Sequence, residues 1–231
     1  MKPLIILDFD GVLFDSVTEV YQVCEHLAKD DSLLRDGLLF DEFLAFRSQL
    51  TDAWQFSRLY QKNRILHDIT YLPQVVPDDE DWAFADKFFS TRAELIKDLN
   101  WAKRMSPYSF FYQLRPFLLD YPDKFKILST RNRESIERTL EFFDVSGIEI
   151  FSQKDIREHG SKVEVVKHSG LLHSGNYVIY IDDMKSHLEP FESTIDLCVH
   201  AGWGYGDTQE GSYTQEQAFN IVSAVLNLSK E

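Results

Sequence analysis

The stretch Pro3-Leu4-Ile5-Ile6-Leu7-Asp8-Phe9-Asp10-Gly11 decides the fold class of this chain. Its apolar run lacks the polar alternation of a half-exposed strand, and it is typical of a parallel strand that is buried on both faces. Gly11 permits an immediate turn after the run. The sequence therefore predicts that Asp8 lies at the carboxyl end of a buried strand, with Asp10 two residues further on.

Similar apolar segments recur along the rest of the chain and alternate with helical patterns. The segments are short and rich in Ile, Leu, Val and aromatic residues: Phe125 to Leu128, Ile148 to Phe151, Tyr177 to Ile181 and Ile195 to Val199. Amphipathic patterns predict helices between Thr130 and Ile148, over 161–171 and over 215–228. Strands that alternate with helices in this way predict an α/β fold with a parallel sheet.

Residues 17–114 have a different pattern, with helical periodicity, many aromatic residues and no convincing buried strand. The apolar residues expected on the faces of two consecutive helices are Phe40, Phe43, Leu44, Leu50, Trp54 and Leu59, and a further helix is expected over 82–99. The acidic cluster 78–81 is expected to cap that helix rather than to bind metal. We predict a core formed by 1–16 and 115–231, with a helical subdomain inserted at 17–114.

The composition is that of a soluble globular protein, with 44% hydrophobic and 27% charged residues in a chain of 231. A formal net charge of −14 opposes binding to nucleic acid or to an anionic membrane. Cys24 and Cys198 have no metal-ligand spacing, and we expect buried, reduced thiols. The apolar run before Asp8 is too short for a signal peptide. These features predict a cytoplasmic protein.

Two carboxylates at the end of a buried strand suit phosphoryl chemistry. Open α/β sheets bind ligands at the carboxyl ends of their strands, where Asp8 is expected. One carboxylate can attack phosphorus while the other, Asp10, donates a proton to the leaving oxygen, provided that a cation offsets their repulsion. Mg²⁺ prefers such hard oxygen ligands. An isolated Asp-x-Asp is nevertheless more often a solvated turn, so the remaining motifs must decide.

Asp8-Phe9-Asp10-Gly11 resembles the first motif of the haloacid dehalogenase-like superfamily, whose phosphatases carry Asp-x-Asp-Gly after the first strand. The resemblance implies three further motifs in a fixed order. The second is a hydroxyl residue that closes the second strand, and in Lys126 to Asn132 the best fit is Ser129, with Thr130 as the alternative. This hydroxyl and nearby amides would hold a phosphoryl oxygen.

The third motif is a lysine near the start of a later helix, and Lys162 fits this position. Its ammonium would neutralise both Asp8 and the substrate phosphate, next to a helix N-terminus that also presents donors to anions. Lys167 lies deeper in the same helix and Lys154 lies before it. Both are weaker candidates.

The fourth motif is an acidic pair after an apolar strand, and Asp182-Asp183 follows Val178 to Ile181. The resemblance implies that Asp183 ligates Mg²⁺ directly and that Asp182 lies beside it or acts through water. Many relatives carry another acid four residues after the metal ligand, but His187 stands there in this chain. The hydrogen bonding around the acidic pair is therefore left open.

The resemblance also bears on the insert. In the superfamily, a helical insert directly after the first motif is a cap that closes over the active site. The glycine-rich stretch 201–206 resembles a loop of the phosphoglycolate phosphatase-like branch, although its three glycines are expected to serve tight turns rather than substrate contact. The basic residues of the insert are expected on solvated faces, and its histidines on the surface or in packing: Arg47, Arg58, Lys62, Arg64, His26 and His67.

Together these features predict a Rossmann-like three-layer α/β core with an inserted all-helical cap. The predicted function is Mg²⁺-dependent hydrolysis of a small phosphorylated metabolite through an aspartyl phosphate. The residues expected to act are Asp8 and Asp10 in catalysis, Ser129, Thr130 and Lys162 on the phosphoryl group, and Asp8, Asp10, Asp182 and Asp183 around the metal. A mutase or phosphotransferase would use the same motifs, and a non-catalytic binding protein is the alternative from another class. A dehalogenase fits less well because that branch lacks the second Asp. The oligomeric state does not follow from the sequence.

Overall fold

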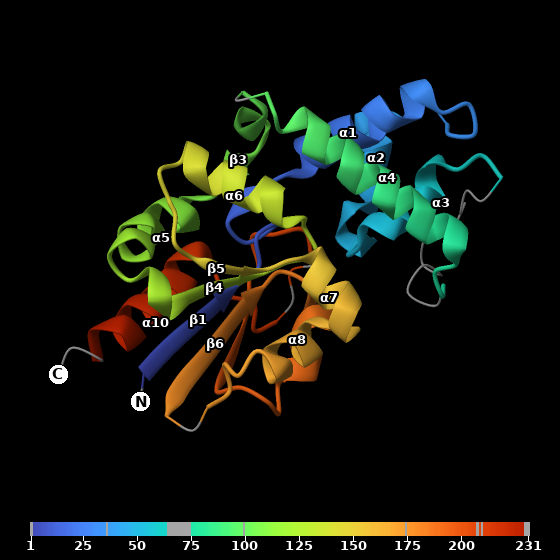
Figure 1. The fold of residues 1–231 in the computed structure, drawn as a ribbon. Coiled ribbons are helices and arrows are strands. Elements are labelled where there is room, and N and C mark those ends of the chain that lie inside the picture. The colour runs from blue at the N-terminus through green and yellow to red at the C-terminus, as the bar shows by residue number, and fades with distance from the viewer. Residues whose placement is uncertain are drawn as a thin grey trace. The chain divides into compact units, whose positions relative to one another are not determined.

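The structure is a computed structural model that describes residues 2–35, 37–63, 75–98, 100–173, 175–206, 208 and 210–228 (Figure 1). The chain divides into two compact units. One consists of Met1–Asp15 together with Ser106–Glu231, and the other of Ser16–Met105.

A five-stranded parallel sheet forms the centre of the first unit. Its strands lie in the order β5-β4-β1-β6-β7, so the N-terminal strand occupies the middle. Their bounds are Lys2–Leu7 for β1, Phe125–Leu128 for β4, Glu149–Phe151 for β5, Asn176–Asp182 for β6 and Leu197–His200 for β7. All five strands that the apolar runs predict are present, and the α/β fold class is confirmed.

Helices cover both faces of this sheet and give a three-layer, Rossmann-like architecture (Figure 1). Their bounds are Ser109–Asp120 for α5, Arg133–Phe142 for α6, Gln153–His159 for α7, Lys162–His168 for α8, Lys185–Leu188 for α9 and Gln215–Leu228 for α10. The sequence did not predict α7. A capping box starts it, with Asp155 accepting from the Ser152 amide, and Gly160 ends it at a φ of 89°.

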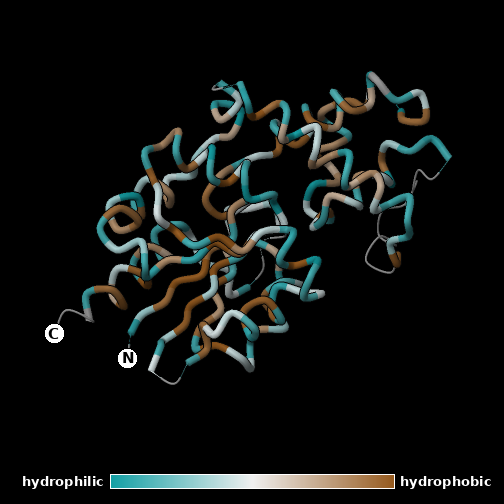
Figure 2. Tube along the Cα trace, in the orientation of Figure 1, coloured by the Kyte–Doolittle hydropathy of each residue, from teal (hydrophilic) through white to brown (hydrophobic). Residues whose placement is uncertain are grey.

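The strands supply the core of the α/β unit. Side chains of β1 alternate between the two faces, and Ile5, Ile6 and Leu7 are fully buried. On one face, Ile6 packs in a cluster with Tyr180 of β6 and Val166 of α8. Figure 2 shows the resulting apolar centre, in which the strands are the most hydrophobic segments of the trace. Each such buried aliphatic side chain stabilises the fold by roughly 1.5–3 kcal/mol.

A two-stranded antiparallel sheet marks the limits of the insert. Strand β2 (Phe14–Asp15) pairs with β3 (Ser106–Pro107), so the segments that precede and follow the insert are neighbours within the α/β unit. The insert therefore ends before residue 106, whereas the sequence prediction extended it to Leu114. The aromatic start of α5 caused this error, since Phe111 and Leu114 are fully buried in the α/β core and the Phe111 ring contacts Phe14.

The second unit is helical in its described part. Its helices are α1 (Val17–Asp30), α2 (Phe40–Phe46), α3 (Ser57–Tyr60) and α4 (Asp79–Leu95), with 3-10 turns η1 (Arg47–Gln49), η2 (Ala53–Phe56) and η4 (Trp101–Arg104). The second of the two consecutive helices expected here is instead a 3-10 turn followed by the single turn of α3. Leu44, expected on an apolar face, is exposed. The acidic cluster caps α4 as predicted, because Asp78 accepts from the amides of Glu80 and Asp81.

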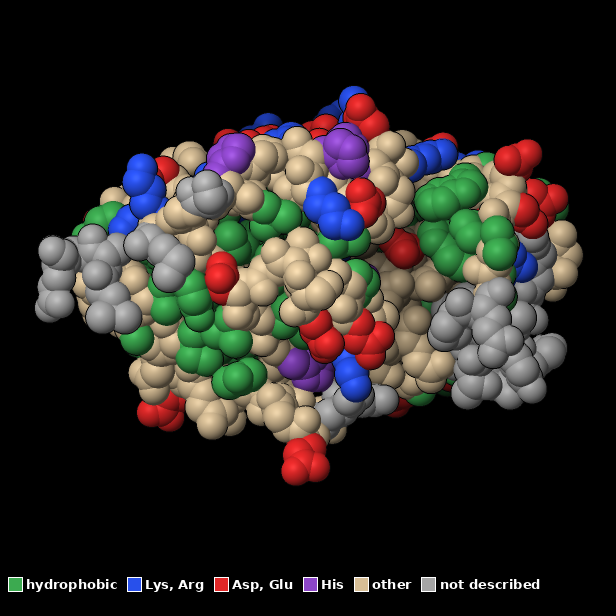
Figure 3. All heavy atoms as spheres, turned by 90° about the horizontal axis from the view of Figure 1, so that it is seen from below, with side chains coloured by type: hydrophobic (Ala, Val, Ile, Leu, Met, Phe, Trp, Pro, Cys, Tyr) green, Lys and Arg blue, Asp and Glu red, His purple; other side chains and the backbone are tan. Residues whose placement is uncertain are grey.

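No helix in the described ranges is long and apolar enough to cross a bilayer. Both cysteines are free. Cys24 is buried, and burial raises the pKa of its thiol well above the ordinary value, whereas Cys198 is half-buried rather than fully buried as expected. On the face shown in Figure 3, acidic and basic side chains are interspersed among apolar ones, and the described residues gather into no basic patch there.

A buried ion pair lies inside the helical unit. Glu19 of α1 accepts hydrogen bonds from Arg92 of α4, with Nε–Oε1 at 3.0 Å and a second guanidinium nitrogen at 3.2 Å from Oε2. The indole nitrogen of Trp101 donates to the same carboxylate at 3.0 Å. Removing one member of such a pair leaves an uncompensated buried charge, which is far more destabilising than losing an exposed pair.

We expect Glu19→Gln to lower the free energy of unfolding by about 3 kcal/mol, because Arg92 loses its counter-charge in a buried site. Urea denaturation followed by far-UV circular dichroism measures this change. Glu94→Gln is the matched control, since Glu94 forms an ion pair with Lys97 in which both side chains are about 70% exposed. Its effect should stay within about 0.5 kcal/mol. Equal effects of the two variants would contradict the structural importance of the buried pair.

Candidate active site

The candidate site lies at the carboxyl edge of the parallel sheet. Leu7 of β1 is in register with Ile127 of β4 and with Ile181 of β6. Because the three strands run in the same direction, the residues that follow them meet at one edge. Asp8 continues this register, and its amide donates to the Ile181 carbonyl at 2.9 Å. The backbone of Asp8 is therefore fixed by the same ladder that builds the core.

Lys162 joins two of the expected acids. It is the first residue of α8, and its ammonium lies 2.8 Å from Asp182 Oδ2 and 3.3 Å from Asp8 Oδ1. Ser161 is the N-cap of this helix, and its hydroxyl accepts from the Glu164 amide. All three charged side chains are almost completely buried, so each depends on the others for charge compensation.

Burial and charge act in opposite directions on these groups. Burial raises the pKa of Asp8 to about 6, and the attraction of Lys162 only partly offsets this. For Asp182, burial also raises the pKa, but Lys162 and His187 outweigh it and hold the carboxyl pKa below its usual range. Burial lowers the pKa of Lys162, but Asp182 and Asp8 more than compensate and keep the amine protonated. The metal-free site thus contains one firmly ionised acid and one that titrates near pH 6.

Asp182 is saturated with hydrogen bonds. Its carboxylate accepts from the Tyr180 hydroxyl and from the Met184 amide at 2.8 Å. His187 Nδ1 lies 3.2 Å from both carboxylate oxygens and 3.2 Å from Lys162 Nζ. At the position where many relatives carry an acid, this chain therefore places a histidine against the lysine and the first acid of the pair.

Asp8, Asp182 and His187 form a group whose ligand atoms lie within 4.8 Å of one another, as in a metal site. The Lys162 ammonium approaches an atom of each of them, at 2.8 to 3.3 Å. This space is therefore already taken by a cation of the protein itself.

Asp183 lies against the turn that follows Asp10. A Cβ atom at Gly11 would lie 2.2 Å from Asp183 Oδ2, so only glycine permits this approach. The Tyr205 amide donates to the same oxygen at 2.6 Å, and His200 Nε2 lies 2.9 Å from the Asp183 carbonyl oxygen. Asp183 is thus buried, and the contacts named here come from a backbone amide and a histidine ring.

The glycine-rich loop 201–206 holds Asp183 and the first motif together. Within it, Trp203 donates its indole N–H to the Val12 carbonyl at 3.1 Å, and the Tyr205 hydroxyl donates to Asp15 at 3.0 Å. A Cβ atom at Gly206 would lie 2.0 Å from the Asp183 carbonyl oxygen. Gly204 and Gly206 thus leave no room for a side chain against Asp183, whereas Gly202 packs against Ser212.

Ser129 directly follows β4, and its amide donates to the Phe151 carbonyl at 2.9 Å. Its buried hydroxyl accepts from the Arg131 amide at 3.4 Å, while Thr130 is half-buried. Sequence reasoning overlooked Arg131, whose guanidinium is buried and lies 2.8 Å from Asp10 Oδ1. The sequence did contain an indication of this role, because Arg131 is a long cationic residue two positions after Ser129, at the sheet edge where two acids were also expected.

The alternative lysines lie away from this cluster. Lys154 is exposed, and the exposed Lys167 pairs with Glu164 on its own helix. Neither contacts Asp8 or Asp182 in the ion pairs of the described residues. Lys162 is therefore the lysine that the fold brings to the acids.

Two arginines of the insert are not on solvated faces, contrary to expectation. Arg47 is buried and donates to the Leu50 carbonyl at 2.6 Å, and Arg58 pairs with the buried Asp81. Both arginines bind within the helical unit, because the Leu50 carbonyl and the Asp81 carboxylate need hydrogen-bond donors where they are shielded from solvent. Lys62 donates to the Ser32 carbonyl, and His26 is exposed as expected. Arg64 and His67 lie outside the described residues.

The charges of the cluster favour a divalent cation. With all groups ionised, four carboxylates and two cationic side chains leave a net charge of −2 at this sheet edge: Asp8, Asp10, Asp182 and Asp183 with Lys162 and Arg131. Asp8 Oδ1 is buried and accepts no hydrogen bond among the described residues. Carboxylate oxygens in this number are the ligands that hard divalent metals prefer. The acidic group can therefore hold a metal.

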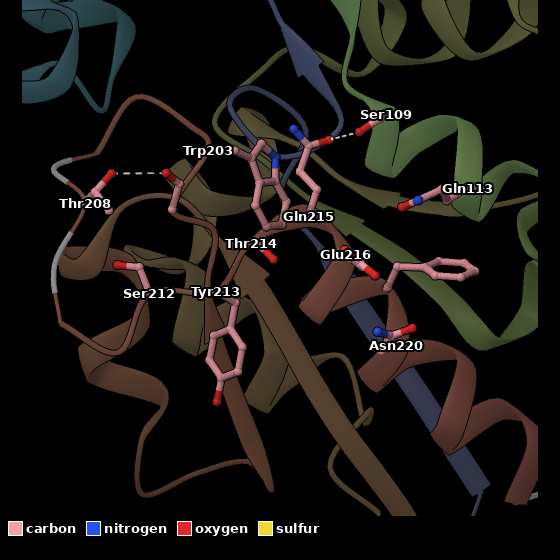
Figure 4. A pocket seen from close by; sticks show the side chains of 12 residues that line it. Ser109, Gln113, Trp203, Thr208, Ser212, Tyr213, Thr214, Gln215, Glu216 and Asn220 are labelled. Carbon is pink, nitrogen blue, oxygen red and sulfur yellow. Dashed lines mark hydrogen bonds between the residues drawn. The ribbon is translucent and has the colours of Figure 1, made fainter.

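A separate cavity of about 770 Å³ lies in the same α/β unit. Figure 4 shows its lining, with Ser109 and Gln113 from α5, Trp203 and Tyr213 from the segment after β7, and Glu216 from α10. None of the four acids or the two cations of the cluster lines this cavity. It is thus distinct from the sheet edge where the charged residues meet.

No family model matches the chain, and no curated protein sequence matches it. Solved structures are similar over nearly its whole length. A predicted phosphatase from Clostridium acetobutylicum has 14% identity, covers 100% of both chains and has a TM-score of 0.61. A haloacid dehalogenase-like family hydrolase from Streptococcus pneumoniae has 13% identity, coverage of 96% of this chain and 98% of its own, and a TM-score of 0.55.

A third similar structure is a β-phosphoglucomutase from Clostridium difficile, at 14% identity, with 99% of each chain covered and a TM-score of 0.56. At these identities the likeness concerns the fold. The similar structures have the same kind of α/β core. This chain has the fold of the haloacid dehalogenase-like hydrolases.

Proposed function

We propose that this protein is a Mg²⁺-dependent phosphatase that hydrolyses a small phosphorylated metabolite through an aspartyl phosphate. One observation carries the proposal. Asp8, at the end of the central strand, has an oxygen that accepts no hydrogen bond among the described residues and lies 3.3 Å from the ammonium of Lys162. A buried carboxylate beside a fixed cation is suited to attack an anionic phosphoryl group, whose charge the cation offsets.

The reaction takes two steps. In the first, Asp8 attacks phosphorus, the bond to the leaving oxygen breaks, and Asp10 gives that oxygen a proton. In the second, Asp10 takes a proton from water, the water oxygen bonds to phosphorus, and the acyl phosphate bond breaks to regenerate Asp8. The proton that Asp10 loses in the first step is thus recovered in the second, and the net products are an alcohol and inorganic phosphate.

Three residues bind and orient the transferred group in this proposal. Lys162 compensates the charge of the phosphoryl oxygens as it compensates Asp8, and Ser129 and Thr130 supply donors at the end of β4. Ser129 is suited to this because its backbone is fixed by the sheet ladder through Phe151. Groups held in place before the reaction need no reorganisation in the transition state, which is the main source of electrostatic catalysis.

The carboxylates of Asp8 and Asp183 and the backbone carbonyl of Asp10 would hold Mg²⁺, with Asp182 beside them. The net charge of −2 and the hard oxygen donors support a divalent ion of this kind. When bound, the metal would neutralise negative charge on the phosphoryl group and on the acids. Asp182 is more strongly engaged by Lys162, Tyr180 and Met184, which supports its role as an anchor rather than a direct ligand.

The helical unit Ser16–Met105 is proposed as the cap that selects the substrate. It is inserted directly after the first motif, between β2 and β3. The boundaries of this proposed cap follow the compact unit rather than residue 114. A cytoplasmic location is part of the same proposal and is supported by the two free cysteines.

A phosphomutase is the second candidate, because one of the similar structures is a β-phosphoglucomutase. The two functions differ in the acceptor of the phosphoryl group, which is water in the phosphatase and a sugar hydroxyl in the mutase. Phosphoglycolate, sugar phosphates and nucleotides should be tested side by side with Mg²⁺. Release of inorganic phosphate supports hydrolysis, whereas an isomeric sugar phosphate without phosphate release would support the mutase.

Asp8→Asn should abolish Mg²⁺-dependent hydrolysis of p-nitrophenyl phosphate, with a loss of at least about 10³-fold in kcat, because an amide cannot form the acyl phosphate. The rate of nitrophenolate release measures this loss. Asp144→Asn is the matched control, since the Asp144 side chain is 87% exposed, and it should retain full activity. An Asp8→Asn variant as active as the wild type would overturn the proposed mechanism.

Mg²⁺ affinity should weaken as the pH falls below about 6. Burial raises the pKa of Asp8 in the metal-free protein from 3.8 to about 6, so below that pH a proton competes with the metal for this carboxylate. Above that pH the competition disappears and the affinity levels off. The expected loss between pH 7.5 and pH 5 is roughly tenfold, measured by isothermal titration calorimetry without substrate. Equal affinities at the two pH values would argue against Asp8 as a metal ligand.

A further inference from the structure

We propose that Arg131 is a positioning residue that holds the Asp10 carboxylate in the orientation needed for proton transfer. The inference rests on the proposed function, in which Asp10 serves as acid and then as base. It concerns a residue of the loop after β4 that contacts both the first motif and α6. Its guanidinium thus lies between the expected acid–base residue and a fixed helix.

The contacts of Arg131 define one orientation of its planar guanidinium. Nε donates to Ser135 Oγ on α6 at 2.8 Å, and one terminal nitrogen donates to Asp10 Oδ1 at 2.8 Å. The guanidinium carbon also lies 5.6 Å from the centroid of the Phe9 ring. Because the guanidinium is a rigid fork, fixing Nε on Ser135 also fixes the direction of the nitrogen that reaches Asp10.

The backbone of Arg131 is also anchored by hydrogen bonds. Its amide donates to Ser129 Oγ at 3.4 Å, and its carbonyl accepts from the Gln153 amide at 3.1 Å. Ser129 in turn follows β4 of the central sheet. Asp10 itself lies in a turn beyond β1. Through Arg131, however, its Oδ1 is linked by hydrogen bonds to the end of β4 and to α6.

A purely structural role explains this pair poorly. The Arg131 side chain is completely buried, whereas the Asp10 side chain is 15% exposed. Burying a guanidinium is costly, and replacing a buried ion pair by apolar residues is often neutral or stabilising. Here the cation is buried and its acid stays partly exposed, and the pair is not expected to be more stabilising than apolar residues. It does keep a reactive carboxylate in place while substrate can still reach it.

Accurate placement of a proton-transfer group has a large effect on rate. General acid–base groups contribute about 10²- to 10⁴-fold, and a displacement of about 1 Å can cost about 10²-fold. Arg131 exchanges no proton in this proposal. The proton moves between Asp10 and the leaving oxygen in the first step, and between water and Asp10 in the second. Loss of Arg131 should therefore slow the reaction only to the extent that Asp10 takes part in it.

A double-mutant cycle tests this dependence. The variants Arg131→Met, Asp10→Asn and their combination are compared by kcat/KM, which reports the steps up to formation of the aspartyl phosphate. Two substrates are used with Mg²⁺. The first is glycerol 2-phosphate, whose alkoxide leaving group must be protonated. The second is p-nitrophenyl phosphate, whose leaving group departs with little need for protonation. We expect Arg131→Met to lower kcat/KM by about 30-fold for the alkyl ester and by less than about threefold for the aryl ester.

In the Asp10→Asn background, the same substitution should lower kcat/KM for glycerol 2-phosphate by less than about threefold, since the group that Arg131 orients is already inactive. Ser135→Ala keeps the guanidinium but removes the partner of Nε, and it should give a smaller loss with the same dependence on substrate and on Asp10. Arg133→Met is the matched control, because the half-exposed Arg133 contacts Asp155 instead of Asp10. It should leave both values within about twofold of wild type.

Thermal melting and Mg²⁺ affinity identify variants that are damaged as a whole. If Arg131→Met fails to fold, Ser135→Ala and Arg131→Lys, which keeps the charge but cannot reach both partners as a fork, carry the test. A loss that is equal for both substrates, or that persists in full in the Asp10→Asn background, would overturn the positioning role. Wild-type protein without Mg²⁺-dependent hydrolysis of either ester would instead refute the proposed function itself.

Discussion

The attraction of one buried ammonium, that of Lys162, for two buried carboxylates is the interaction on which the site depends. Parallel strands that end at a common edge bring Asp8 and Asp182 together whether or not their charges are compensated. Two such acids in a low-dielectric environment would repel each other and favour protonation. The ammonium at 2.8 and 3.3 Å allows both to remain charged at neutral pH, and the N-terminus of α8 is placed so that its first side chain supplies this charge.

The four acids have different surroundings, although they lie in one cluster. Asp8 and Asp182 share Lys162, Asp10 pairs with Arg131, and Asp183 accepts from the backbone amide of Tyr205. Neighbouring carboxylates can take different roles only if their surroundings differ in this way. Asp10, which pairs with Arg131, is the acid proposed for proton transfer, and Asp183, which accepts from the Tyr205 amide, is one of the two carboxylates proposed to hold the metal.

The sequence was sufficient for the sheet, because buried parallel strands have continuous apolar runs. It was insufficient where contacts between residues far apart in the sequence determine the structure. The Arg131–Asp10 pair joins residues 121 positions apart, and no local pattern indicates it. The aromatic start of α5 looked like part of the insert because apolar content does not reveal which core a helix joins. The short turns η2 and α3 likewise share their apolar pattern with a regular helix.

The pairing of β2 with β3 has a consequence for how this architecture could have arisen. Asp15 and Ser106 are register partners, so the chain leaves the α/β unit and returns to it at one point. The ninety residues between them are therefore an insertion whose two ends are attached to neighbouring backbone segments. Such an insertion can be exchanged or lengthened during evolution without any change in the connections between the strands of the sheet. The proposed catalytic residues of the α/β unit and the proposed substrate-selecting insert are thereby free to diversify at different rates.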